Sequence, residues 1–172
     1  MKTKFLVAIV VACAMSSRAL AHGEEQHHGE DHGGHSMLNE TPFGRAADPS
    51  AAQRTIRVEV RDSLEFFPSE ITVKAGEVIR FVVVNTGKHT HEMVLGTMKD
   101  LDEHNETMKS HPEMHHDEPG MAQVAPGKSG TIVWQFTKAG DFYFGCLVED
   151  HFDFGMMGKI RVTGGPTRAI RP

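Results

Sequence analysis

Cysteine is scarce in this chain. The 172 residues include two cysteines, Cys13 and Cys146, and Cys13 lies in an N-terminal segment that we expect to be removed. A mature chain with one cysteine excludes an internal disulfide. Because an unoccupied thiol is a liability in an oxidising compartment, we expect something to bind Cys146.

Long apolar runs are absent after residue 21, so the sequence predicts no membrane span. Residues 1–21 have a basic start, a short apolar run and a cleavage site at Ala19-Leu20-Ala21, which together are typical of an export signal. We therefore predict a periplasmic protein whose mature chain begins at His22. A lipid anchor at Cys13 is the less favoured alternative, because its cleavage box has valine where leucine is usual.

Positive charge is also in short supply. The formal net charge is −5 at pH 7, and loss of Lys2, Lys4 and Arg18 with the signal would bring it to −8. This balance argues against nucleic acid and anionic membrane surfaces as partners. Removing 21 of the 172 residues leaves 151, a length that suits one domain with a hydrophobic core. We expect that domain to be monomeric.

The start of the predicted mature chain has no aliphatic or aromatic side chain. Residues 22–35, HGEEQHHGEDHGGH, include five histidines. A segment of this composition cannot bury enough apolar surface to fold, so we predict a disordered His-rich tail. A polar linker continues to residue 54, and the predicted folded domain covers residues 55–172.

Short strands are predicted from residue 55 onward. Residues 55–61 alternate three aliphatic side chains with charged ones, as a half-buried strand does. Residues 70–85 predict two strands around a turn at Ala75-Gly76. Further strands of the same kind are predicted at 92–96, 130–136, 141–146 and 158–162. Several short strands separated by turn residues indicate an all-β sandwich.

One segment has a helical pattern instead. Thr97 followed by Asp100 resembles a capping box, and Pro112 would stop a helix, which predicts a helix over residues 97–111. One face of this helix would carry Leu101, His104, Met108 and His111. The helix and the loop after it form an insertion, residues 97–121, and an insertion of this length is usually functional or mobile.

Three metal-binding side chains are evenly spaced in residues 142–160, FYFGCLVEDHFDFGMMGKI. Cys146, His151 and Met156 follow one another at intervals of five. Thiolate and thioether suit reduced copper and imidazole suits both oxidation states, so a trigonal His₂Cys site with a weak axial Met fits copper. The second histidine would come from residues 85–96. His89 and His91 point to the same face of a strand there, and the pattern alone leaves both open.

These two stretches resemble the signatures of the cupredoxins, the small type 1 copper proteins, over roughly residues 55–163. In particular, the chain resembles periplasmic cupredoxins of copper tolerance, which carry a His-rich N-terminus and a His/Met-rich insertion. The resemblance implies a cupredoxin-like Greek-key β-sandwich. Its N-x-G…H-E-F/M and C-x4-H-x4-M motifs correspond to Asn85, Gly87, His91, Glu92 and Met93, and to Cys146, His151 and Met156.

The resemblance also decides between neighbouring candidates. It implies His91, Cys146, His151 and Met156 as the ligands of one type 1 copper ion. Met157 is the alternative axial ligand, but Gly155 before and Gly158 after favour Met156. Glu149-Asp150 stand where many relatives have Pro-Gly, which adds negative charge beside the metal.

Other identities for the site are less favoured. A dinuclear copper site would need a second cysteine in this loop, and a structural zinc site usually has more than one cysteine or a paired C-x-x-C. A buried free cysteine is common in cores, but that interpretation would place His91 and His151 beside Cys146 by chance.

The remaining histidines and methionines suggest copper binding outside this site, because imidazole and thioether suit copper in either state. The free amine of His22 would add a further ligand. The candidates are His22, His27, His28, His32, His35, His104, Met108, His111, Met114, His115, His116 and Met121.

The leading function is therefore periplasmic copper binding in copper tolerance, by a non-enzymatic protein that can exchange electrons with a redox protein partner. A dedicated electron carrier to a respiratory reductase or oxidase is the second hypothesis, and it would not need a metal-binding tail. A cuprous oxidase with a second copper site is the third, and the chain supplies no three-copper cluster for a multicopper oxidase.

Overall fold

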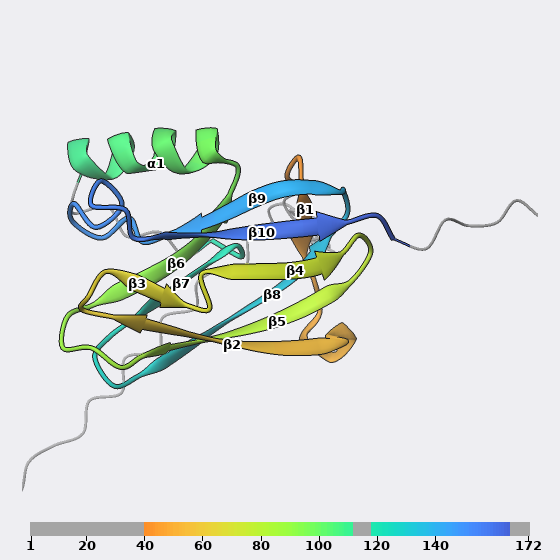
Figure 1. The fold of residues 1–172 in the computed structure, drawn as a ribbon, viewed down its shortest axis with the longest axis horizontal. Helices are drawn as coiled ribbons and strands as arrows, with labels where there is room; N and C mark the ends of the chain where they lie inside the picture. The colour runs from red at the N-terminus through yellow and green to blue at the C-terminus, as the bar shows by residue number, and fades with distance from the viewer. Residues whose placement is uncertain (1–39, 112–117, 166–172) are drawn as a thin grey trace, which may run out of the picture. The chain divides into compact units, whose positions relative to one another are not determined.

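Two five-stranded sheets pack against each other in the computed structural model of the chain, which describes residues 40–111 and 118–165 (Figure 1). The strand order is β1-β8-β5-β2-β3 in one sheet and β4-β10-β9-β6-β7 in the other. The strands are β1 (Gly44–Ala46), β2 (Arg54–Arg61), β3 (Glu65–Phe67), β4 (Glu70–Lys74), β5 (Val78–Asn85), β6 (His91–Gly96), β7 (Met121–Val124), β8 (Ser129–Phe136), β9 (Gly140–Gly145) and β10 (Met157–Thr163).

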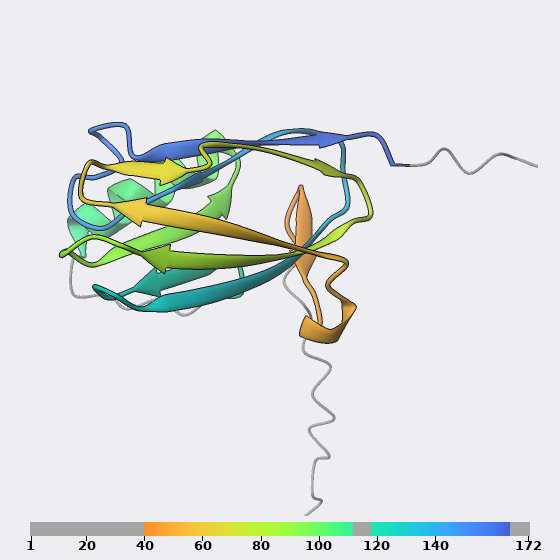
Figure 2. The ribbon, with the colours of Figure 1, turned by 60° about the horizontal axis from the view of Figure 1, so that its bottom comes forward.

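The connections cross between the sheets. Strand β2 pairs in parallel with β5, and β10 pairs in parallel with β4, while the other pairs are antiparallel. Parallel neighbours cannot be joined by a tight hairpin, so the chain must leave one sheet and return. Figure 2 shows this where β4 turns into β5 and passes to the other sheet. The predicted cupredoxin-like sandwich is confirmed.

The alternation predicted from the sequence produces the core. In β2, Val58 and Val60 are fully buried, whereas the charged residues between and beside them face outward. Strand β5 repeats the pattern with Ile79, Phe81 and Val83. The predicted turn between β4 and β5 is also present, and Gly76 adopts φ +89°, a left-handed conformation that favours glycine. Inward-facing side chains of both sheets therefore form one hydrophobic core.

The ordered domain begins before the expected boundary at residue 55. Strand β1 pairs with β8, and a short 3₁₀ helix, η1 (Pro49–Ala51), follows it. Phe43 is 2% exposed, and its ring stacks on Trp134 with ring centroids 5.3 Å apart. The expected linker therefore does not run to residue 54. One aromatic in a polar run has no periodicity, so no local pattern predicts this contact. The predicted export signal and His-rich tail lie outside the described residues.

The predicted helix is confirmed as α1 (Met98–Ser110). Thr97 caps it, and both hydrogen bonds of the capping box with Asp100 are present. Leu101, which is 1% exposed, enters a second hydrophobic cluster with Leu147 and Phe152 from the loop after β9. The helix thereby covers that loop. No helix in the described ranges is long and apolar enough to span a membrane.

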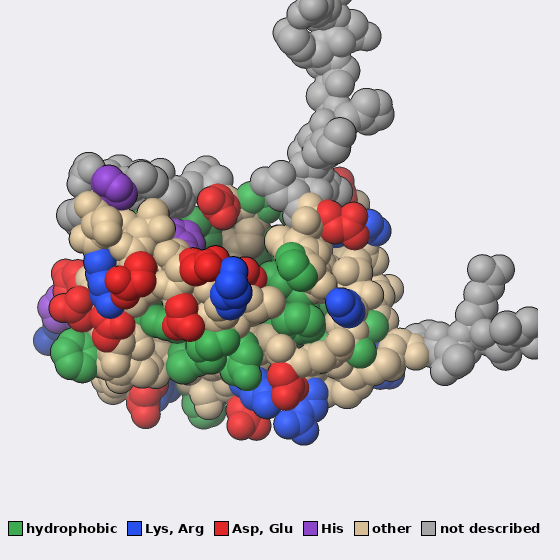
Figure 3. Space-filling view, turned by 90° about the horizontal axis from the view of Figure 1, so that it is seen from above, with side chains coloured by type: hydrophobic (Ala, Val, Ile, Leu, Met, Phe, Trp, Pro, Cys, Tyr) green, Lys and Arg blue, Asp and Glu red, His purple; other side chains and the backbone are tan. Residues whose placement is uncertain are grey.

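Figure 3 views the face that carries α1, where acidic and basic side chains lie side by side. Ion pairs join Lys99 to Glu103 on α1 and Lys159 to Asp141 across β10 and β9. Exposed pairs of this kind contribute little to stability individually. The mixture of signs leaves no large basic patch on this face, in keeping with the acidic composition.

We expect Phe43→Ala to lower the free energy of unfolding by about 3–5 kcal/mol, because it removes a buried aromatic ring. Phe67→Ala is the matched control: Phe67 is 64% exposed and contacts Arg61, so its loss should cost about 1 kcal/mol or less. Urea denaturation of both variants measures the difference. Equal stabilities would mean that Phe43 does not pack on the sandwich in solution.

Candidate metal centre

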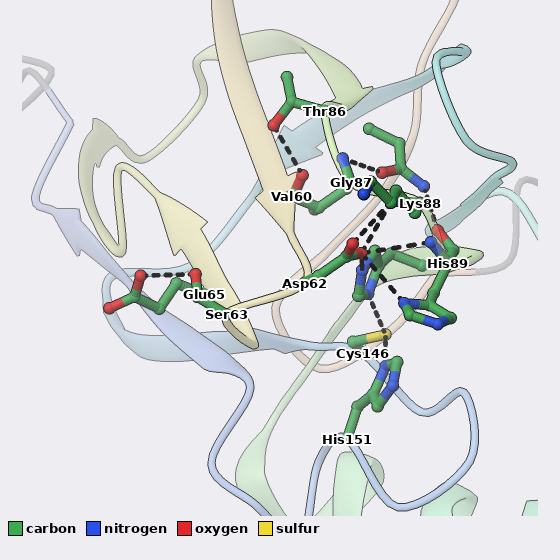
Figure 4. Close-up of polar contacts among 12 residues, drawn as sticks. Val60, Asp62, Ser63, Glu65, Thr86, Gly87, Lys88, His89, Cys146 and His151 are labelled. Carbon is green, nitrogen blue, oxygen red and sulfur yellow. Dashed lines mark hydrogen bonds and ion pairs between the residues drawn. The ribbon is translucent and has the colours of Figure 1, made fainter.

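Three of the predicted ligands meet at one end of the sandwich. The ligand atoms of His91, Cys146 and His151 all lie within 4.8 Å of one another. The Cys146 sulfur is 3.8 Å from Nδ1 of His91 and 3.4 Å from Nδ1 of His151 (Figure 4). The two imidazole rings lie 4.9 Å apart, centroid to centroid. The structure therefore assembles two nitrogens and one sulfur around a single point.

Strand pairing explains why segments distant in the sequence meet. Strands β6 and β9 are antiparallel neighbours, and Val94 pairs with Gly145. His91 is the first residue of β6 and Cys146 directly follows β9, so both lie at the same end of the sheet. His151 belongs to the loop that joins β9 to β10 and returns toward that end.

The loop of residues 146–156 is closed by its own backbone hydrogen bonds. The Cys146 N–H donates to the Met156 carbonyl at 3.1 Å, and the Met156 N–H donates to the His151 carbonyl at 2.9 Å. A turn from Val148 to His151 places Glu149 at φ +51°. The loop therefore turns before His151 although it lacks the Pro-Gly of many cupredoxins.

The two neighbouring methionines have different surroundings. Met156 is fully buried and belongs to the same hydrophobic cluster as Cys146. Met157 starts β10, is partly buried, and packs against the cluster that contains Leu101. The burial of Met156 beside Cys146 agrees with the predicted axial role, which stays a prediction.

The two neighbouring histidines also differ. The His91 side chain is fully buried, whereas that of His89 is 76% exposed. Only His91 joins Cys146 and His151 in a group of donor atoms. Spacing alone left this choice open. The backbone turns His89 to the surface before β6 begins, which agrees with His91 as the predicted ligand, and that assignment stays a prediction.

Glu92 is a buried carboxyl beside the cysteine. It is 3% exposed, its Oε1 accepts a hydrogen bond from the Leu147 N–H at 3.0 Å, and its own N–H points to the Cys146 sulfur at 3.4 Å. Burial raises the pKa of Glu92, while the Leu147 hydrogen bond acts in the opposite direction. The sequence motif contained Glu92 but gave no indication of this role.

Asp62 is a further polar residue at the centre, and sequence reasoning missed it. Its carboxylate accepts hydrogen bonds from the N–H groups of Lys88 and His89 and contacts Nε2 of His91 at 3.2 Å (Figure 4). The Lys88 hydrogen bonds hold the pKa of Asp62 well below its usual range. No local pattern marks this residue, because it lies 29 positions before His91.

Cys146 and His151 are both neutral at neutral pH when no metal is bound. Burial raises the pKa of the Cys146 thiol to about 12, so the thiol keeps its proton at neutral pH. Burial, and then the neighbouring His91, lower the pKa of His151, which keeps its imidazole neutral and able to bind metal. Metal binding must therefore release the thiol proton. One sulfur and two imidazole nitrogens, with a thioether nearby, are a donor set that fits copper.

The candidates for additional copper fall into two groups. Met108 and Met121 are partly buried and pack against the cluster around Leu101, while His104 is half-buried on α1 and His111 is exposed at its C-terminal end. Within residues 40–111 and 118–165, no second group of three His, Cys, Asp or Glu side chains comes together. The other candidates lie outside the described residues: His22, His27, His28, His32, His35, Met114, His115 and His116.

Comparisons with known proteins agree with this geometry. A family model described as copper binding proteins of the plastocyanin/azurin family matches residues 52–163. The chain is 45% identical to the copper-resistant cuproprotein CopI of Rubrivivax gelatinosus, over 94% of this chain and 99% of the relative. It is 34% identical to CopI of Pseudomonas aeruginosa, over 70% and 82% of the two chains.

Solved structures with the same fold include two auracyanins. Auracyanin B aligns with a TM-score of 0.60 and 21% identity, over 72% of this chain and 99% of that one. The reduced auracyanin of Roseiflexus castenholzii aligns with a TM-score of 0.56 and 24% identity, over 65% and 98%. At these identities the likeness concerns the fold alone.

We expect His91→Ala to abolish the visible absorption of the copper-loaded protein, because it removes a buried nitrogen donor. His89→Ala should leave the spectrum nearly unchanged, since its side chain faces solvent. Absorption and electron paramagnetic resonance spectra of both variants provide the measurement. Loss of the spectrum with His89→Ala and its retention with His91→Ala would reverse the assignment.

We expect Met156→Leu to retain copper and to raise the reduction potential, because an axial thioether bonds weakly. A tenfold change in the relative affinity for the two oxidation states corresponds to about 59 mV for one electron. Met157→Leu is the control, and its potential should stay close to that of wild type. Voltammetry distinguishes the two variants, and a shift in Met157→Leu alone would exchange the roles of the two methionines.

Proposed function

The chain belongs to the plastocyanin/azurin family of copper-binding proteins, among the relatives of the copper-resistant cuproprotein CopI, and on this basis we propose that it holds one type 1 copper ion for copper resistance. His91, Cys146 and His151 would bind the ion, with Met156 as a weak axial ligand. The observation that carries the proposal is the assembly of three donor atoms within 4.8 Å.

The surroundings of the ligands suit this role. His91 and Cys146 are fully buried, so the backbone and core would keep water from the metal. The His151 side chain is 13% exposed and is the one of these three ligands that reaches the surface. Copper bound by these donors would exchange one electron between its two oxidation states. His151 is therefore the natural contact point for a redox protein partner.

Copper resistance is favoured over a dedicated electron carrier for two reasons. First, the chain matches two copper-resistant cuproproteins over most of their length. Second, it carries a His-rich segment that an electron carrier does not need. The exposed edge of His151 supports electron exchange in either case. We propose a periplasmic, non-enzymatic protein. A cuprous oxidase would need a second copper site, and the described residues hold no second group of three His, Cys, Asp or Glu ligands.

The proposal predicts the outcome of a copper titration of the mature protein, beginning at His22. One equivalent should produce an intense visible band, because thiolate-to-copper charge transfer requires Cys146. Cys146→Ser should lose this band while keeping the fold, since serine replaces the thiol with little change in volume. Cells producing Cys146→Ser should tolerate less copper than cells producing wild type. A visible band that persists in Cys146→Ser would contradict the assignment of Cys146 as a ligand.

The same titration tests the outer histidines. A chain lacking residues 22–36, with His104, His111, His115 and His116 changed to Ala, should keep the band and lose copper beyond the first equivalent. Imidazole must be neutral to bind, so this extra copper should dissociate as the pH falls below about 6.5. If wild type binds a single equivalent at saturation, the extra sites do not exist and the electron carrier becomes the better hypothesis.

A further inference from the structure

One carboxylate touches the metal centre from outside the predicted ligand set. Asp62 directly follows β2, in the turn before β3, and its Oδ1 lies 3.2 Å from Nε2 of His91. The His91 side chain is fully buried, so packing holds it in place where it meets Asp62. The Asp62 side chain is 32% exposed and is fixed by further hydrogen bonds.

The two ring nitrogens of His91 face two different side chains. Nδ1 faces the Cys146 sulfur and Nε2 faces the Asp62 carboxylate. An ionised carboxylate can only accept hydrogen bonds, so a neutral His91 must carry its proton on Nε2. The lone pair of Nδ1 is then left on the side of the cysteine. Asp62 thereby selects the tautomer that a metal in the predicted site requires.

The turn of residues 86–90 presents Asp62 with two backbone donors. The Lys88 N–H donates to Oδ2 at 2.8 Å, and the His89 N–H donates to Oδ1 at 3.2 Å. Asn85 holds this turn, because its side chain accepts from the Gly87 N–H at 2.8 Å and donates to the His89 carbonyl at 2.7 Å. Backbone hydrogen bonds therefore hold the carboxylate in its position against His91.

Gly87 leaves the space that this arrangement needs. A Cβ at this position would collide with the Oδ1 and Cγ atoms of Asp62. The glycine of the N-x-G stretch thus permits the turn and the carboxylate to approach each other. Asn85 and Gly87 thus both shape the turn that contacts Asp62.

We propose that Asp62 is a positioning residue that fixes the tautomer and orientation of His91 and makes its imidazole a stronger donor to copper. The proposal rests on the proposed copper site. A carboxylate that accepts from the outer N–H of a ligating imidazole raises the basicity of the inner nitrogen. A more basic nitrogen favours Cu(II) over Cu(I), so Asp62 should lower the reduction potential relative to a neutral acceptor.

The alternative is that Asp62 only holds the surface turn through Lys88 and His89. Both roles predict some loss of stability when Asp62 is changed, so stability cannot separate them. The state of His91 can. A purely structural Asp62 would leave the His91 tautomer, the outer imidazole nitrogen and the copper potential unchanged when its charge is removed.

The decisive experiment compares wild type with Asp62→Asn in the full mature chain. Nitrogen NMR of the metal-free protein at about pH 8, above the unperturbed histidine pKa, should show wild-type His91 protonated on Nε2. In the Cu(II)-loaded proteins, pulsed electron paramagnetic resonance should show a changed coupling for one outer imidazole nitrogen in Asp62→Asn. Cu(II) affinity should fall by about 10–100-fold, and the potential should rise by about 59 mV for each tenfold loss specific to Cu(II).

Two further variants separate the effects. Gly87→Ala keeps the carboxylate but displaces it, and should shift the outer nitrogen coupling and the potential in the same direction as Asp62→Asn. Asp141→Asn is the control for loss of one negative charge, because Asp141 pairs with Lys159 and lies at the opposite end of β9 from Cys146. Its copper properties should match wild type.

Wild-type values of coupling, affinity and potential in Asp62→Asn would overturn the proposal, as would His91 protonated on Nδ1 in metal-free wild type. If Asp62→Asn does not fold, the wild-type NMR result and Gly87→Ala still decide the matter. A wild-type protein without a type 1 spectrum would overturn the proposed function, while the NMR experiment would still test Asp62 separately.

Discussion

Glu92 joins the two halves of the metal centre. Its N–H points to the Cys146 sulfur and its carboxyl accepts the Leu147 N–H, which links β6 to the ligand loop across 54 and 55 residues of sequence. Both contacts are buried, where an unmade hydrogen bond would carry the full cost of desolvation. Together with the pairing of β6 and β9, this connection sets the position of Cys146 relative to His91.

The rest of the molecule maintains that connection from outside. Helix α1 covers the ligand loop: Leu101 packs with Leu147 and Phe152, and the side chains of Asn105 and Lys109 both contact Asp153. The insertion was expected to be a candidate for copper binding. In its described part, it stabilises the loop that carries three of the four predicted ligands. The closed backbone hydrogen bonds of residues 146–156 then aim those ligands inward.

Burial gives this site its chemical character. Desolvation raises the pKa of Cys146 and lowers that of His151, so the metal-free centre carries no charge on these ligands. The negative charge lies instead on Asp62, which contacts Nε2 of His91 and is stabilised by backbone N–H groups. The neutral Cys146 thiol and His151 imidazole lie inside, and the Asp62 carboxylate lies against the outer nitrogen of His91.

The sequence by itself determined the features that depend on neighbours along the chain. Alternation with a period of two predicted most strands, a capping box predicted α1, and Cys146, His151 and Met156 were recognisable because one loop contains all three. His91 was separated from His89 only by resemblance to a family. The tertiary structure agrees with that prediction, because the turn before β6 exposes His89 and buries His91.

Tertiary structure alone decided what depends on distant segments. Phe43 meets Trp134 across two strands, β7 pairs with β6 although its four residues lack a clear pattern, and Asp62 reaches His91 from another turn. None of these contacts has a local signature, because each forms between segments that are far apart in the sequence. Local spacing could therefore point to Cys146, His151 and Met156 as candidate ligands, while the groups that orient them were set by packing.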